Sequence, residues 1–299
     1  MNSPPYLNHG DRIAIVSTAR KITPADVLPA IRIFNNWGLE VIEGRHLYDA
    51  RDQFAGSDEI RLEDLQHMLD DDTVRAIIGS RGGYGTVRIV DRLDFTKFVQ
   101  HPKWIIGYSD VTVLHSHIHR HYGIETMHAL MPVNFRDLCD AVPAIFTLKK
   151  ALFGKGLEYF IPGSPMNRRG SATGILAGGN LSILCNLAGT NSDIDTSGKI
   201  LFLEDVDEYL YHIDRMMMNL KRSGKLENLA GLIVGSMTKM RDNEVPFGKT
   251  VEGIIADAVS EYSYPVCFNF PAGHQEDNRA LILGREVAFE VSENVLLAF

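Results

Sequence analysis

The 299-residue sequence has little cysteine, no surplus of positive charge and no long apolar run. Its three cysteines (Cys139, Cys185 and Cys267) are odd in number and lack metal-ligand spacing, so we expect buried free thiols. The net charge of −8 is opposite to the basic balance typical of nucleic-acid-binding proteins. No apolar run reaches the roughly 18 residues of a membrane span. Neither nucleic acid nor a membrane is therefore an expected partner.

The first residues also lack two features of a secretory signal. Residues 1–6 contain neither a basic stretch nor an apolar one. Together with the scarce cysteines, this predicts a cytoplasmic protein. Hydrophobic residues make up 45% of the chain and charged residues 23%, which is ordinary for a globular enzyme, and the length allows two domains.

Strand and helix patterns alternate through the first half of the chain. Apolar, β-branched runs at 11–17, 39–43 and 74–79 predict strands, and capping residues at Thr23 and Ser57 begin the helices between them. Helices are also expected over 86–93 and 111–121. This alternation is typical of an α/β fold with a parallel, doubly wound sheet, whose sites lie beyond the carboxyl ends of its strands.

The second half begins after a stretch with scattered glycine and proline. We predict one domain over 1–135, a linker over 136–170 that contains a helix at 142–153, and a second domain over 171–299. The elements expected in the second domain are a turn-rich segment at 174–180, helices at 181–187, 211–223 and 250–262, strands at 200–203, 231–235 and 266–270, and two final strands within 279–299.

Ser109 is the candidate nucleophile. A short strand ends in Gly107-Tyr108-Ser109, and a helix follows at once, which lifts the hydroxyl clear of a sheet edge. The backbone N–H of Asp110 is then free at a helix N-terminus to stabilise an oxyanion. The usual motif has glycine where this chain has Val111, so an alternative is that Ser109 or Asp110 caps the helix.

The loop 81–85, Arg-Gly-Gly-Tyr-Gly, is the second candidate element. It lacks the third glycine of a dinucleotide fingerprint and the lysine of a phosphate-binding loop, so a phosphate site is the weaker alternative. Glycines allow the backbone N–H groups to approach a substrate carbonyl, and such a loop would supply a second oxyanion donor opposite Asp110. We expect Gly82 and Tyr84 to contact the substrate.

Four histidines at 115, 117, 119 and 121 suggest a metal cluster at first sight. On a helix they fall on two faces, and no carboxylate or cysteine is spaced to complete a site. We therefore expect no metal.

Glu204 and His274 each follow a predicted strand. Alone, Glu204 is equally explained as a helix cap and His274 as an exposed loop residue. Together with Ser109 they supply the serine, acid and imidazole of a nucleophilic hydrolase, in which His274 takes the serine proton and Glu204 orients the imidazole.

At this point the sequence resembles the LD-carboxypeptidases of murein recycling, a serine peptidase family that also contains the microcin C immunity peptidases. The residues that carry the resemblance are 10–17, 81–85, 107–112, 178–182, 203–206, 213–216, 273–274 and Asn278. The resemblance implies a Ser109–His274–Glu204 triad and an oxyanion hole made by Asp110 and Gly83. It also implies a flavodoxin-like N-terminal domain, a second α/β, β-rich domain, an active site in the cleft between them, and a homodimer.

The reaction implied by the resemblance is release of terminal D-alanine from a muropeptide tetrapeptide, with no cofactor. The alternative within the family is cleavage of an aminoacyl nucleotide. The only tryptophans, Trp37 and Trp104, lie outside the second domain, which disfavours base stacking there. A non-catalytic nucleotide-binding module is the alternative of another class. Possible anion partners are Arg88, Arg215 and Arg279, for which salt bridges are an equal explanation.

Overall fold

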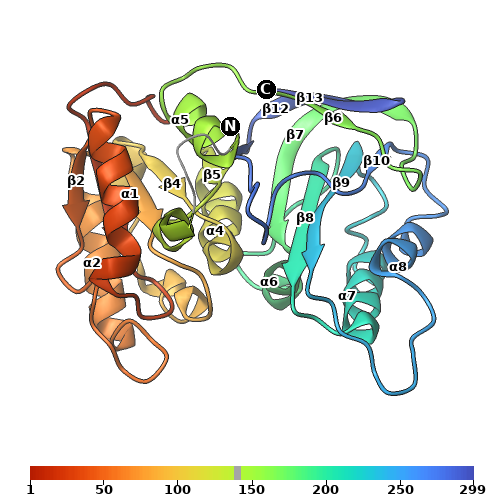
Figure 1. Ribbon diagram of the computed structural model, residues 1–299, viewed down its shortest axis with the longest axis horizontal. Helices are drawn as coiled ribbons and strands as arrows, with labels where there is room; N and C mark the ends of the chain where they lie inside the picture. The colour runs from red at the N-terminus through yellow and green to blue at the C-terminus, as the bar shows by residue number, and fades with distance from the viewer. Residues whose placement is uncertain (138–142) are drawn as a thin grey trace.

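The computed structural model describes residues 1–137 and 143–299, so that Cys139 and the expected helix start at Val142 lie outside the described residues. The strands form two sheets that lie side by side, with the N-terminal half on the left of Figure 1 and the C-terminal half on the right. In the described part of the chain, no helix is both long and apolar enough to cross a membrane.

The first sheet has the strand order β11-β5-β4-β3-β1-β2. Its strands are β1 (Arg12–Val16), β2 (Glu40–Glu43), β3 (Val74–Gly79), β4 (Trp104–Ile106), β5 (Thr126–His128) and β11 (Leu281–Leu283). The first five are parallel and follow the flavodoxin-like order, and β11 adds an antiparallel edge. The expected fold class is confirmed.

Helices cover both faces of this sheet because its strands are apolar on both sides. Ile13 and Ile15 of β1 pack in one core cluster with α1, whereas Ala14 and Val16 pack in another with α2. The helices are α1 (Pro24–Asn36), α2 (Asp58–Asp70), α3 (Thr96–Gln100), α4 (Thr112–Tyr122) and α5 (Pro143–Leu152), and the 3-10 turns are η1 (Thr86–Arg88), η2 (Val90–Arg92), η3 (Ser109–Val111) and η4 (Pro132–Asp137).

The second sheet is mixed, with the order β10-β9-β8-β7-β12-β13-β6. Its strands are β6 (Glu158–Pro162), β7 (Gly170–Asn180), β8 (Ile200–Val206), β9 (Gly231–Thr238), β10 (Val266–Cys267), β12 (Glu286–Val291) and β13 (Asn294–Ala298), and its helices are α6 (Leu181–Leu187), α7 (Leu210–Arg222) and α8 (Val251–Ala258). Leu201 and Leu203 of β8 pack with α7 and α8. Phe202 of the same strand belongs to the cluster that contains Trp104 of the first sheet, so the two halves share a core.

Several expected elements are wrong in detail. Residues 174–180 form part of β7 instead of turns, because Gly178 (φ 135°) and Gly179 (φ 144°) let this strand run close to its neighbours. A Cβ atom on Gly178 would clash with the carbonyl oxygen of Phe202. The helix expected over 86–93 is the pair of short turns η1 and η2.

The chain end also differs from expectation. Gly284 (φ 91°) divides the first of the two expected strands, so that β11 joins the first sheet and β12 the second. The strand expected over 266–270 ends already at Cys267. Within 136–170, α5 covers most of the expected helix, and β6 forms the outer edge of the second sheet.

Candidate active site

Ser109 lies at the sharp connection between β4 and α4. Its backbone is in the left-handed region (φ 60°), which a residue other than glycine rarely adopts. A Cβ atom on Gly107 (φ 151°) would lie 2.7 Å from Cγ2 of Val111, so the turn needs glycine there. Neither η3 nor α4 has a side-chain cap hydrogen bond, which disfavours the capping alternative. This strand–turn–helix geometry is that of a nucleophile elbow.

The glycine loop lies directly beside Ser109. A Cβ atom on Gly82 would be 2.7 Å from both Cβ and Oγ of Ser109. Gly83 has φ 128°, and a Cβ atom on it would be 2.6 Å from Cγ of Arg20. Only glycine permits this close approach, and it leaves the backbone of the loop exposed next to the serine.

Two buried charged side chains, Asp110 and Arg61, lie next to the C-terminal end of the glycine loop. The carboxylate of Asp110 is buried and accepts a hydrogen bond of 2.9 Å from the backbone N–H of Thr86, and burial raises its pKa. Arg61 is 1% exposed, donates to the carbonyl of Thr18 at 2.5 Å and pairs with Asp58. The side chain of Asp110 therefore fixes the loop, while its backbone N–H stands at the start of η3, where that turn has no acceptor for it.

Glu204 and His274 form a buried acid–imidazole pair. Oε2 of Glu204 lies 2.7 Å from Nδ1 of His274 and also accepts the backbone N–H of His274 at 3.2 Å. Glu204 is fully buried on β8, whereas the His274 side chain is 18% exposed. A Cβ atom on Gly273 (φ 112°) would lie 2.7 Å from Oε2 of Glu204, so this glycine lets the loop close over the carboxylate.

The pair shifts the pKa of both of its members. Burial alone would lower the pKa of His274, but the charge and hydrogen bond of Glu204 outweigh burial and raise it. Burial alone would raise the pKa of Glu204, but the charge and hydrogen bond of His274 outweigh it and lower that pKa. Both directions favour a carboxylate that stabilises an imidazolium, as a triad acid must.

One open cavity of about 620 Å³ brings most of these groups together. Its lining includes Ser109 and His274 from opposite halves, with Gly82, Gly83 and Tyr84 of the glycine loop. Ser109 and His274 line the same cavity, and within the described residues no hydrogen bond joins them.

The cavity also contains residues that the sequence analysis missed. Arg20 follows β1, Lys239 (φ 55°) follows β9, and Asp207 (φ 63°) follows β8. The ring of Tyr108 packs edge-on against His274, with ring centroids 4.8 Å apart. Arg20, Lys239 and Asp207 follow the carboxyl ends of parallel strands. Sites in such sheets lie beyond these ends, so the argument that singled out Ser109 and Glu204 also applies to these three residues.

Three of the four histidines of α4 lie within hydrogen-bond distance of other residues of the chain. Nε2 of His115 lies 2.9 Å from the carbonyl oxygen of Gly107, Nδ1 of His117 lies 2.9 Å from Ser192, and Nε2 of His119 lies 3.0 Å from Thr126. Burial lowers the pKa of His115 and of His119 to about 3. Among the residues described, no group of three or more ligating side chains could hold a metal ion.

None of the three arginines considered as anion partners is among the residues that line the cavity. Arg88 pairs with Asp58, and Arg279 pairs with Asp277 at 2.9 Å. The guanidinium of Arg215 lies 5.2 Å from the ring centroid of Tyr211. The salt-bridge explanation therefore holds for the first two.

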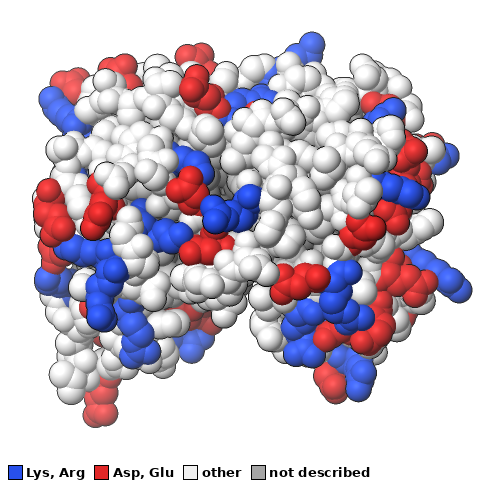
Figure 2. Space-filling model, turned by 180° about the vertical axis from the view of Figure 1, so that it is seen from behind, with Lys and Arg blue, Asp and Glu red and all other residues white. Residues whose placement is uncertain are grey.

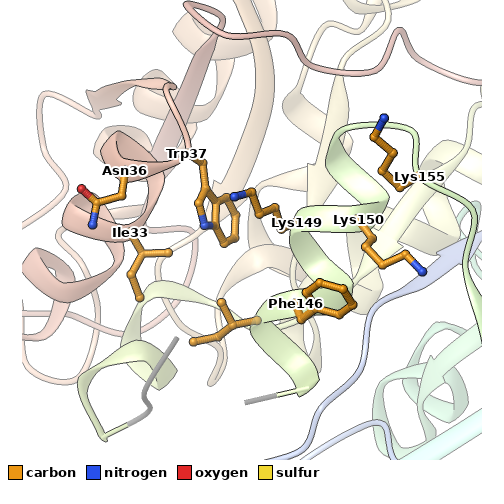
Figure 3. A pocket seen from close by; sticks show the side chains of 8 residues that line it. Ile33, Asn36, Trp37, Phe146, Lys149, Lys150 and Lys155 are labelled. Atoms are coloured by element: carbon orange, nitrogen blue, oxygen red, sulfur yellow. The ribbon is translucent and has the colours of Figure 1, made fainter. Parts of the chain in front are cut away.

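A second cavity, of about 670 Å³, lies between α1 and α5 and is lined by none of the predicted site residues (Figure 3). In it, Nζ of Lys149 lies 5.7 Å from the ring centroid of Trp37, and Phe146 is exposed.

On the face of the molecule in Figure 2, acidic and basic side chains are interspersed, so no field of a single sign covers that face.

An α/β protein that assembles a serine, an imidazole and a buried carboxylate at one cavity has the arrangement that nucleophilic hydrolases use. Comparisons with known proteins agree. A family model of the LD-carboxypeptidase N-terminal domain matches residues 13–129, and one of the LD-carboxypeptidase C-terminal domain matches residues 173–289.

The similarity to known proteins extends over nearly the whole chain. A probable murein peptide carboxypeptidase of Bacillus subtilis is 36% identical over 97% of this chain and 92% of its own length. The crystal structure of muramoyltetrapeptide carboxypeptidase from Oxalobacter formigenes superposes with a TM-score of 0.88 at 27% identity, covering 96% of this chain and 98% of that one. MccF in complex with glutamyl sulfamoyl guanosine has the same TM-score, 0.88, at 18% identity, over 98% of this chain and 97% of its own, which shows a shared fold alone.

The chain belongs to the LD-carboxypeptidase family, and it is a hydrolase of the serine carboxypeptidase type. This membership favours an enzyme over the non-catalytic nucleotide-binding module.

Proposed function

We propose that this enzyme hydrolyses the L,D amide that holds the terminal D-alanine of a muropeptide tetrapeptide, using Ser109, His274 and Glu204. The observation that carries the proposal is the Glu204–His274 pair, whose imidazole lines the same cavity as a serine in the left-handed conformation. The name of the Bacillus subtilis relative, a murein peptide carboxypeptidase, supports the substrate class.

The geometry suggests a role for each group. Nδ1 of His274 is occupied by Glu204, so Nε2 takes the proton of Ser109 as its oxygen attacks the carbonyl carbon. The N–H groups of Gly83 and Asp110 stabilise the oxyanion of the tetrahedral intermediate. His274 then protonates the departing amine, an acyl-enzyme remains on Ser109, and a water activated by the same imidazole releases it.

The positions of the tryptophans favour a peptide over an aminoacyl nucleotide. Trp37 lies on α1 beside the second cavity, and Trp104 on β4 is fully buried. Neither lines the cavity of Ser109, so neither stacks on a base bound there.

Mass spectrometry of purified protein tests the proposal. The protein is incubated separately with tetrapeptide and with an aminoacyl sulfamoyl adenylate, and Ser109→Ala is the control. We expect loss of one alanine from the tetrapeptide, an intact adenylate, and no product with the variant. Cleavage of the adenylate alone would favour the immunity-type activity.

The domain division extends the proposal. We propose that 1–135 and 171–299 are the two domains and that 136–170 links them; the two family matches, at 13–129 and 173–289, support this division. Limited proteolysis tests it: first cuts are expected within 136–170 outside α5 and β6, and first cuts inside a strand of either sheet would contradict it.

We also propose a cytoplasmic homodimer, as the family resemblance implies. Light scattering is expected to give twice the chain mass of 33.4 kDa. A monomer at micromolar concentration would contradict the dimer, and recovery of the protein outside the cytoplasm in a cell fractionation would contradict the location.

A further inference from the structure

A carboxypeptidase must recognise the free carboxylate at the end of its substrate. In a peptide that loses its last residue, the terminal carboxyl carbon is three bonds from the scissile carbonyl carbon, at most about 4 Å away. A cation that binds this carboxylate must therefore lie next to the oxyanion hole, and it would reject peptides that lack the charge.

Three cations line the Ser109 cavity: Arg20, Arg81 and Lys239. Within the described ranges, none of them forms an ion pair, unlike Arg88 and Arg279. The acids of the same cavity already have partners, because Asp207 pairs with Arg241 and Glu208 lies 2.5 Å from His212. Positive charge is thus available to a ligand in this cavity.

Arg20 lies directly against Gly83, one of the two proposed oxyanion donors. Its Cγ, Cδ and Nε atoms would lie 2.6, 2.8 and 3.1 Å from a Cβ atom on Gly83. Arg81 instead donates to the carbonyl oxygen of Lys21 at 3.3 Å, and Lys239 comes from the opposite half of the molecule.

The backbone on both sides of Arg20 is fixed. The carbonyl of Ala19 accepts the N–H of Ala55 at 3.0 Å, and the N–H of Lys21 donates to the carbonyl of Gln53 at 3.1 Å. Arg20 itself forms an isolated bridge with Phe54. A guanidinium on a fixed backbone suits recognition of a carboxylate, because only the side chain has to be ordered on binding.

We infer that Arg20 binds the C-terminal carboxylate of the substrate and thereby restricts the enzyme to removal of a terminal residue. The inference rests on the proposed function and adds to it the group that selects a free peptide end. Arg20 contacts the substrate and takes no part in proton transfer.

The test compares two substrates and three variants. The substrates are the tetrapeptide with a free C-terminal carboxylate and the same peptide with a C-terminal amide. Wild type should prefer the acid by about 100-fold in kcat/KM. Arg20→Gln should lose about 100-fold on the acid and change less than about threefold on the amide, because only the acid uses the guanidinium. Arg20→Lys should restore part of the loss.

Lys239→Gln is the matched control, since it removes a cation from the other side of the same cavity. It should keep the preference for the acid. Loss of that preference in Lys239→Gln but not in Arg20→Gln would overturn the inference, as would an equal loss on both substrates in Arg20→Gln. A wild-type enzyme that cleaves neither peptide would overturn the proposed function itself.

Discussion

The two halves of the molecule contribute to the cavity in different ways. The first sheet supplies strained backbone: Ser109 has a left-handed conformation, and Gly82 allows contact that a side chain would block. The second sheet supplies buried charge, since Glu204 is fully buried and holds His274 by a short hydrogen bond. In the proposed mechanism, the first half fixes the position of the nucleophile, and the second half sets the protonation of the imidazole.

This difference also separates two kinds of mutational sensitivity. At Gly82, in the first half, an added methyl group is expected to disturb the site because it would lie 2.7 Å from Ser109. In the second half, an isosteric change of charge disturbs it because burial magnifies each charge.

The largest expected effect is that of Ser109→Ala. Removal of the proposed nucleophile should lower kcat on tetrapeptide by about 10⁴- to 10⁶-fold, measured as released alanine. Circular dichroism checks that the variant is folded. Retention of activity within tenfold would show that the serine has a structural role only.

The next largest effect is expected for Glu204→Gln, which should lower kcat/KM by about 10²- to 10⁴-fold. In the wild type, Glu204 raises the pKa of His274 above its ordinary value of 6.5, so activity should fall as the pH drops through a value above 6.5. Without that charge, burial lowers the pKa of His274, and the acid limb should move below 6.5.

A pH profile of kcat/KM measures this shift. Glu208→Gln is the control, because it removes a carboxylate that lines the same cavity but pairs with His212. Its acid limb should stay where the wild type has it. An unshifted limb in Glu204→Gln would contradict the proposed pairing.

Gly82→Ala should lower kcat/KM by a smaller factor, about 10²-fold, because a misplaced catalytic group costs about that much. Its Cβ atom would lie 2.7 Å from Cβ and Oγ of Ser109, so the serine must shift. Gly156→Ala is the control, since its Cβ atom would meet nothing within 4 Å. Equal activity of the two variants would argue against contact between the loop and the serine.

The smallest expected effect is that of a chelator. We expect EDTA to leave tetrapeptide hydrolysis unchanged, because the proposed steps use only side chains and backbone N–H groups. Loss of activity that zinc restores would contradict this prediction and would indicate that the histidines of α4 bind a metal.

The sequence predicted correctly those features that depend on a few neighbouring residues, such as sharp turns and helix starts. Gly107 and Ser109 predicted a sharp turn after β4, and Thr23 with Pro24 predicted the start of α1, where Thr23 Oγ1 lies 2.6 Å from Asp26 Oδ2. These are local features, and local patterns encode them. The flavodoxin-like order required the family resemblance, because parallel strands pair through distant segments.

The features that the sequence did not predict depend on contacts between residues that are far apart in the chain. Gly178 and Gly179 looked like a turn, but their use depends on the neighbouring strand and on α4, which the local sequence does not contain. Arg20 was missed although it follows a predicted strand, because only the fold places it against Gly83. For Arg88, the sequence left an anion site and a salt bridge equally open, because its partner Asp58 is thirty residues away.

The central claim is that Ser109 and His274, from different halves, act as one unit. The most direct test is kcat/KM on tetrapeptide for Ser109→Ala, His274→Ala and the double variant. If the two act together, the double variant should be no worse than either single variant by more than a few fold. Losses that multiply in the double variant would contradict the account, because they would mean that the two residues act independently.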